Sequence, residues 1–342
     1  MRLPRLADSL AQLAEGGREV FYDGPLAAAI VETVAALGGV LQLSDFKNHK
    51  SDWVTPIATS YRDYRILQLP PNGQGVSVLQ AMALLNGVDM ASWGHGSVEA
   101  THWQIEAVKA AMADAQAHIA DADALRVSTG WFLDESRLSA IRSQISHASV
   151  GAANRLEGGG DTAFVCVADA AGNFAAVIGS LFIPWASGIT AGHTGILLQN
   201  RGHGFSLDPA HPNCIAGNKR PRHTILPAML FRDDLPVMAF GFVGGDMQVQ
   251  AQVQFLCNLI DFEMNPQEAL DAPRWRYEGT GAAVALESPL MAKLRDGLTA
   301  RGHELVGSGG FFGGGQAVLW HRTLQSLQGV SDGRRDGLAL GL

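Results

Sequence analysis

The stretch Gly158-Gly-Gly-Asp-Thr162-Ala-Phe-Val-Cys-Val-Ala168 contains an abrupt change of pattern. Before it, residues 143–160 show neither a helical nor a strand period, which predicts a flexible linker. After it, residues 162–168 read as a buried strand, and a turn at 169–173 leads into a second strand over 174–182. We therefore predict a hairpin that starts directly behind a loose glycine linker. A self-cleaving chain needs this arrangement, because the bond to be cut must bend while the new terminus is held rigidly.

Thr162 is the hydroxyl residue at the head of this predicted hairpin. If the bond between Asp161 and Thr162 is cut, the freed α-amino group can act as general base for the threonine hydroxyl. An α-amino group has a pKa of about 7.7–8.0, so it can accept that proton near neutral pH without a histidine. The alternative is an ordinary strand threonine. The chain has no P-loop, H-E-x-x-H or dinucleotide motif that would favour another chemistry.

A second candidate feature is the pair Gly244-Gly245. It follows an apolar strand over residues 237–243 and precedes a helix over residues 248–260. Two glycines between a strand and a helix present backbone N–H groups at the positive end of the helix dipole, which suits an anion such as a tetrahedral oxyanion. The alternative is an ordinary glycine turn.

The remaining segments alternate helix, loop and strand. The clearest is a helix over residues 98–121 with one apolar stripe. The charged residues off this stripe are Glu99, Glu106, Lys109 and Asp114. Its histidines, His102 and His118, are interpreted as surface or cap residues rather than ligands. The shorter predicted elements are a helix over 27–37 ended by Gly38-Gly39, a short helix capped by Ser44-Asp45, a strand over 64–69 and a helix over 75–85.

The composition indicates a globular protein with a substantial core. The chain has 342 residues, of which 47% are hydrophobic and 17% charged. Its net charge of −8 and the lack of a Lys/Arg run argue against a nucleic-acid surface. No apolar stretch reaches the length of a membrane span, and no signal peptide is visible at Met1. The cysteines, Cys166, Cys214 and Cys257, lack metal or redox spacing and are interpreted as small buried residues.

These motifs, in this order, resemble the gamma-glutamyltranspeptidase family. In that family a processing threonine heads a strand that leads to an Asp-x-x-Gly-Asn turn, as Thr162 and Asp169-Ala-Ala-Gly-Asn173 do here. The likeness covers essentially the whole chain. Its other motifs are Phe21-Tyr-Asp-Gly24, Gly38-Gly39, Tyr61-Arg62, Pro70-Pro-Asn-Gly-Gln-Gly75, Ser187-Gly188, Gly192, Gly195-Ile-Leu-Leu-Gln-Asn200, Asn218-Lys-Arg-Pro221, Gly244-Gly245, Asn265-Pro-Gln-Glu-Ala-Leu-Asp-Ala-Pro-Arg274 and Ser331-Asp-Gly-Arg-Arg-Asp-Gly337.

The resemblance implies a role for each catalytic position. Thr162 is the nucleophile and, once freed, its own base, and Asp161–Thr162 is the processing site. Gly244 and Gly245 form the oxyanion hole. Ser180 occupies the position of a second hydroxyl that orients the nucleophile, and an ordinary strand serine is its alternative.

The substrate positions combine likeness and departure. By resemblance, His223 and Thr224 occupy the site where the family uses two serines to hold the substrate α-carboxylate. Phe182, Arg201 and Gly204 replace an asparagine, a glutamine and an aspartate that surround the α-amino group. Because a desolvated ammonium needs a carboxylate partner, recognition of a free γ-glutamyl amine is not expected. Arg201 suits an anionic acyl group without an amine, such as a glutaryl group, and its alternative is a surface arginine.

The resemblance also implies the fold and the subunits. The expected fold is the α+β class, an αββα four-layer sandwich of the N-terminal nucleophile hydrolase type. Residues 1–161 correspond to the C-terminal part of a large subunit and residues 162–342 to the small subunit. Family precursors carry a long segment before the region that begins here at Leu6, so we expect that segment to be missing. The loop over 208–217 is short, so no closing lid is expected.

The sequence therefore predicts a self-processing amidohydrolase or acyltransferase that cleaves a γ-glutamyl or glutaryl-like amide through an acyl-threonine intermediate. Its expected partners are a small-molecule amide and the two cleaved subunits themselves. No metal, organic cofactor, nucleic acid or membrane is expected. Two alternatives stay open. One is an inactive relative or fragment that serves as a scaffold, and the other is a protein that binds a small anion at Arg201, His223 and Gly244-Gly245 without turnover.

Overall fold

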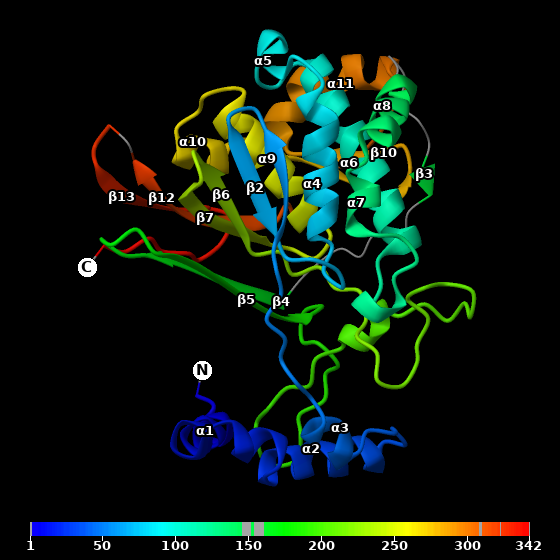
Figure 1. Cartoon of the computed structure of the whole chain (residues 1–342), viewed down its shortest axis with the longest axis vertical. Helices are drawn as coiled ribbons and strands as arrows, with labels where there is room; N and C mark the ends of the chain where they lie inside the picture. The colour runs from blue at the N-terminus through cyan, green and yellow to red at the C-terminus, as the bar shows by residue number, and fades with distance from the viewer. Residues whose placement is uncertain (1, 146–151, 154–160, 308–309, 322, 342) are drawn as a thin grey trace.

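A six-stranded antiparallel sheet forms the centre of the computed structural model, which describes residues 2–145, 152–153, 161–307, 310–321 and 323–341. The strand order is β1-β2-β6-β7-β12-β13 (Figure 1). The sheet combines strands from both ends of the chain, so its core depends on distant segments. The strands are β1 (Ile57–Tyr61), β2 (Tyr64–Gln68), β6 (Ala228–Arg232), β7 (Leu235–Val243), β12 (Gly314–His321) and β13 (Ser326–Ser331).

Three helices cover one face of this sheet: α4 (Gly75–Asn86), α6 (Val98–His118) and α9 (Met247–Ile260) (Figure 1). Their apolar side chains meet those of the sheet. For example, the ring of Phe255 on α9 lies 5.6 Å from that of Phe242 on β7. Both rings are fully buried, and each such burial contributes about 1.5–3 kcal/mol. In the described part of the chain, no helix is long and apolar enough to cross a membrane.

The predicted hairpin is confirmed and lies on the opposite face of the sheet (Figure 1). Its first strand is buried on one face only rather than throughout, since Val165 and Val167 on the other face are exposed. It consists of β4 (Asp161–Ala168) and β5 (Phe174–Phe182). The inward side of β4 carries Phe164, whose ring lies 2.5 Å from the place that a Cβ at Gly241 of β7 would occupy. Glycine at 241 therefore lets the hairpin approach β7 closely. Of the linker predicted over residues 143–160, residues 143–144 instead end the helix Glu135–Gln144, and β3 (Ala152–Ala153) pairs with β9 (Thr280–Gly281). Most of the remaining linker lies outside the described residues.

The remaining elements surround this centre. Helices α1 (Pro4–Tyr22), α2 (Pro25–Ala36) and α3 (Leu43–Lys47) lie beyond the hairpin, on its side away from the six-stranded sheet (Figure 1). A three-stranded sheet has the order β11-β10-β8. The other bounds are α5 (Met90–Trp93), η1 (Ala122–Ala124), α7 (Thr129–Phe132), α8 (Glu135–Gln144), η2 (Arg201–Gly204), α10 (Pro266–Asp271), β8 (Trp275–Tyr277), β10 (Ala283–Leu286), α11 (Ser288–Ala300) and β11 (Glu304–Val306).

Most predicted elements are present, with two corrections at their ends. The short helix α3 is capped by Gln42 rather than by Ser44, because the Asp45 carboxylate accepts the backbone N–H of Gln42 at 2.8 Å. Helix α6 ends at His118 rather than at residue 121. Asp121 instead caps η1 with its side chain.

The interpretation of His102 as a surface or cap residue is wrong, whereas His118 is the partly exposed last residue of α6. His102, Glu106 and Lys109 are all buried, because α6 packs against α4, α9 and α11 at once. Lys109 donates to Glu106 at 2.8 Å, so the buried charges neutralise each other. The expected burial of the cysteines is confirmed for Cys257, whereas Cys166 and Cys214 are partly exposed.

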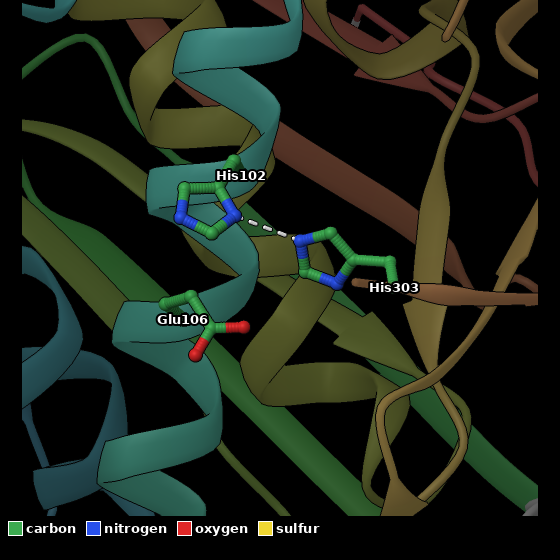
Figure 2. A group of neighbouring side chains, drawn as sticks. All are labelled: His102, Glu106 and His303. Atoms are coloured by element: carbon green, nitrogen blue, oxygen red, sulfur yellow. Dashed lines mark hydrogen bonds between the residues drawn. The ribbon is translucent and has the colours of Figure 1, made fainter. Parts of the chain in front are cut away.

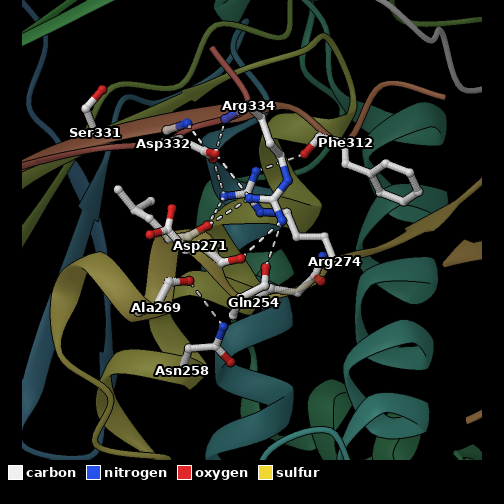
Figure 3. A network of polar contacts seen from close by, with 12 residues as sticks. Gln254, Asn258, Ala269, Asp271, Arg274, Phe312, Ser331, Asp332 and Arg334 are labelled. Carbon is white, nitrogen blue, oxygen red and sulfur yellow. Dashed lines mark hydrogen bonds and ion pairs between the residues drawn. The ribbon is translucent and has the colours of Figure 1, made fainter. Parts of the chain in front are cut away.

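Two of the motif stretches meet in a buried ion-pair network (Figure 3). Arg274, at the end of the first stretch, pairs with Asp332 of the second at 2.5 Å, and both side chains are almost fully buried. The same guanidinium donates to the carbonyl oxygens of Leu270 and Phe312 at 2.9 and 3.0 Å. The network fixes the C-terminal segment against α10 and β12.

Candidate active site

Thr162 lies at the start of β4, directly behind the linker, and is partly buried. It is paired across the hairpin with Ser180 of β5, and its Oγ1 donates to the Ser180 hydroxyl oxygen at 3.0 Å. The Ser180 oxygen also accepts the backbone N–H of Phe182 at 3.0 Å. The two hydrogen bonds fix the serine, and the serine in turn orients the threonine hydroxyl.

The hairpin turns Thr162 toward the six-stranded sheet. Successive side chains of a strand point to opposite faces, so Thr162 shares its face with Phe164 and Cys166. Phe164 packs on β7, and β4 also contacts β12. Val165, on the other face, is 58% exposed. The threonine hydroxyl therefore lies on the side of the hairpin that meets β7.

Gly244 and Gly245 form the turn between β7 and α9. Their φ angles are +132° and +59°, a region that side chains other than glycine rarely adopt. A Cβ at Gly244 would lie 2.8 Å from the ring of Phe311, so the first position also lacks the room. The carbonyl groups of both glycines accept from the first turn of α9, at 3.1 Å each from Met247 and Gln248. The turn thus sits at the positive end of the helix dipole.

A cavity of about 580 Å³ is lined in part by Asp246, the residue that follows the glycine pair. Arg201 lies in its wall, with Cζ 4.4 Å from the centre of the Phe182 ring and Nη1 donating to the Thr224 hydroxyl at 3.2 Å. The charged side chains in the lining are Arg201, Arg222 and Asp246, in addition to two histidines. The excess of cationic groups favours an anionic ligand.

The departures from the family pattern meet in this cavity. Phe182, Arg201 and Gly204 all line it, although they come from β5 and η2. A Cβ at Gly204 would lie 2.8 Å from the carbonyl oxygen of Arg222, so an aspartate could not replace this glycine without a backbone shift. Phe182 has a φ of +88°, a strained conformation for a non-glycine residue.

His223 is placed differently from the other predicted substrate residues. Among the described residues that line the cavity, Thr224 is present and His223 is not. The His223 ring packs on Gly73, 2.9 Å from where a Cβ there would lie, and its Nδ1 accepts the Ile225 N–H at 3.3 Å. Burial, together with the charges of two nearby arginines, lowers the pKa of His223 to about 4, so the ring is neutral at pH 7.

Two charged residues of the cavity, Asp246 and Arg222, were not predicted from the sequence. Asp246 directly follows the glycine pair, so its position beside a predicted anion site was an available signal. Asp246 supplies a carboxylate to the cavity, although the glycine at position 204, where the family pattern has an aspartate, had suggested that the cavity would contain none. Arg222 had no such signal, because it lies in an irregular segment whose path is decided by tertiary contacts.

The loop around residues 205–215 forms a fixed wall of the cavity. Its two sides are joined by hydrogen bonds from Ser206 N to Asn213 O at 2.9 Å and from Ile215 N to Ser206 O at 3.0 Å. His211 Nε2 lies 2.7 Å from the carbonyl oxygen of Gln116, which anchors the loop to α6. These anchors agree with a short loop that is held in place.

One buried group has the residue types of a metal site: His102, Glu106 and His303 (Figure 2). Their ligand atoms lie within 4.8 Å of one another. However, His102 Nδ1 and His303 Nε2 are hydrogen-bonded to each other at 2.8 Å, and Lys109 already neutralises Glu106. A divalent cation would therefore leave excess positive charge in the core, so these residues do not fit a metal.

Comparison with solved structures defines the class of fold. The chain superposes on the crystal structure of a cephalosporin acylase from Bacillus halodurans with a TM-score of 0.90 and 36% identity, over 98% of this chain and 62% of that one. The protein thus has the mixed helix-and-sheet fold of an acylase.

The chain belongs to the gamma-glutamyltranspeptidase family, whose model matches residues 1–342. It is 36% identical, over 98% of its length, to the glutathione hydrolase-like YwrD proenzyme of Bacillus subtilis. It is 32% identical, over 99%, to the oxamate amidohydrolase proenzyme of Klebsiella pneumoniae. The chain spans 65% of the length of each of these relatives.

Proposed function

We propose that this protein is a self-processing amidohydrolase or acyltransferase with Thr162 as its nucleophile. The observation that carries the proposal is the hydrogen bond between Thr162 and Ser180 at the head of a strand that follows a glycine linker. Phe182, two residues after Ser180, lines the cationic cavity. The proenzyme names of the similar proteins support self-processing.

The proposed reaction uses groups of this chain alone. Cleavage between Asp161 and Thr162 frees an α-amino group, which takes the proton of the Thr162 hydroxyl as its oxygen attacks the substrate amide carbon. Backbone N–H groups of Gly244 and Gly245 stabilise the tetrahedral oxyanion. The amine then leaves with the proton, and water or another amine releases the acyl group from the threonine ester.

The proposed acyl group is anionic, as in a glutaryl or γ-glutamyl amide. Arg201 and the Thr224 hydroxyl provide a cationic donor and a neutral donor at one wall of the cavity. Asp246 offers a carboxylate in the same cavity, which suits a donor group on the substrate. His223 is neutral and packs on Gly73, so it supplies no charge to the cavity.

We further propose that the described layers belong to an αββα four-layer sandwich and that cleavage yields subunits 1–161 and 162–342. The six-stranded sheet supports continued association of the two pieces. β1 and β2 precede the cleavage point and β6 follows it, and β2 pairs directly with β6. Separating the pieces would expose a sheet edge and the core beneath it.

The first test is the state of the purified chain. Wild-type protein should show two pieces with masses that match cleavage before Thr162, whereas Thr162→Ala should remain one chain. A folded wild-type chain that stays uncut would overturn the proposal, and an uncut chain that still binds glutarate would identify an anion-binding protein.

The second test addresses the acyl group. Glutaryl and γ-glutamyl chromogenic amides are compared for wild type, Arg201→Ala and Arg232→Ala. Arg232 is the matched control, because its guanidinium also lies over a ring, that of Tyr64 at 5.2 Å, but it is not part of the cavity lining. Loss of a charge-assisted hydrogen bond should raise KM for the glutaryl amide roughly tenfold or more in Arg201→Ala only. An unchanged KM would refute the role of Arg201.

A further inference from the structure

Gln74 is a fully buried side chain that connects the cavity to the glycine turn. Its Nε2 donates to Asp246 Oδ1 at 3.0 Å, and its Oε1 accepts from Arg222 Nη1 at 3.3 Å. Both of these partners line the cavity, and Asp246 is the residue that follows Gly244-Gly245. One amide thus spans the short path between the wall of the cavity and the turn.

The segment that carries Gln74 is itself held firmly. Gln74 N donates to the carbonyl oxygen of His223 at 3.2 Å, and His223 N donates to the carbonyl oxygen of Asn72 at 3.1 Å. Gly73 lies under the His223 ring with no room for a Cβ. The amide of Gln74 therefore starts from a fixed backbone position, at the N-terminal end of α4.

We propose that Gln74 is a positioning residue that sets the Gly244-Gly245 turn relative to the substrate cavity. The inference rests on the proposed function, in which that turn holds the oxyanion. An amide can donate to a carboxylate and accept from a guanidinium at the same time, and neither an apolar nor a carboxylate side chain can do both at neutral pH. Gln74 thus connects Arg222, in the wall of the cavity proposed to bind the substrate anion, to Asp246 and the adjoining glycine turn, where the oxyanion charge would develop.

Removal of the amide should affect the chemical step more than binding. Without its donor, Asp246 and the adjoining turn can shift, and a misplacement of about 1 Å at a reacting centre costs on the order of 100-fold in rate. We expect Gln74→Leu to lower kcat by roughly 10- to 100-fold with a smaller change in KM, because oxyanion contacts act in the transition state.

A second variant gives a signature that a merely structural role would not produce. Gln74→Glu keeps the size of the side chain and its acceptor for Arg222, but the ionised form cannot donate to Asp246 and repels it. Protonation restores a donor, and two facing carboxyl groups share one proton with a raised pKa. The kcat of Gln74→Glu, divided by the kcat of wild type at the same pH, should therefore rise toward one as the pH falls below about 6.

Gln80→Leu is the matched control. Gln80 is also fully buried on α4 and donates to a carboxylate, that of Asp114, which pairs with Arg137. Both leucine variants should lose similar thermal stability, but only Gln74→Leu should lose kcat. Equal kcat in the two variants, or a pH profile of Gln74→Glu that matches wild type, would overturn the proposal.

Hydrogen exchange separates this proposal from the proposed function. If wild type hydrolyses no amide, the proposed function fails, and the positioning role is judged from amide exchange in residues 241–248. Faster exchange there in Gln74→Leu than in Gln80→Leu would support the positioning role. Equal exchange in both variants would refute it.

Discussion

His303 is predicted to make the stability of the protein depend on pH. It is 2% exposed and shares a hydrogen bond of 2.8 Å with His102 in the core (Figure 2). Burial, together with the charges of His102, Lys109 and Arg301, lowers the pKa of His303 from 6.5 to about 3. The perturbation is His303→Gln, because an amide can take up the hydrogen bond to His102 but does not titrate in this range.

The magnitude follows from proton linkage. The folded-state pKa of His303 is depressed, so the unfolded chain binds more protons than the folded one between pH 6.5 and about 3. Stability is therefore retained above pH 6.5 and lost as the pH falls. At pH 5 the loss is about 1.36 kcal/mol for each of about 1.5 pH units, or about 2 kcal/mol.

The assay is urea unfolding at pH 8 and pH 5, in a Thr162→Ala background so that the chain stays uncut. His303→Gln should lose about 2 kcal/mol less than its parent between the two pH values. The chain has 11 histidines, and the comparison cancels the contribution of the other ten. Equal losses in parent and variant would refute the reasoning.

Three further outcomes are expected. Arg274→Met should cost about 1.5–3 kcal/mol in urea unfolding, because it removes one of the two ion pairs of the buried Asp332 carboxylate and leaves only the pair with Arg334, and a cost below about 0.5 kcal/mol would contradict this. Gly241→Val should cost about 1–3 kcal/mol or shift the hairpin, since its side chain meets the ring of Phe164, and an unchanged melting temperature would argue against that contact. His223 is already neutral at pH 5–8, so the pH dependence of KM for an anionic amide should be the same in wild type and in His223→Gln over that range. Steady-state kinetics of both proteins from pH 5 to 8 checks this, and a change in KM near pH 6.5 in wild type alone would contradict it.

Local patterns predicted the elements that carry the site. The hairpin of β4 and β5 and the strand, glycine pair and helix around Gly244 were found because alternation, helical period and glycine punctuation act over a few residues. The ends of elements were less accurate. Helix α6 stops at His118, where tertiary contacts rather than propensity decide the end.

The burial of polar residues could not be predicted from the same patterns. A helix with one apolar stripe has its polar face in water only if nothing else covers that face. On α6 the neighbouring helices α4, α9 and α11 enclose it, so Glu106 and Lys109 pair in the core and His102 meets His303 from a distant segment.

The sequence by itself determined the strand-heading threonine, the glycine turn and the family to which the chain belongs, because these are signals of neighbouring residues in a fixed order. Only the tertiary structure decided that Arg201, Arg222 and Asp246 share one cavity and that Gln74 joins two of them. Such contacts connect residues up to 172 positions apart. Their geometry depends on how the layers pack, so it cannot be predicted from the periodicity of neighbouring residues.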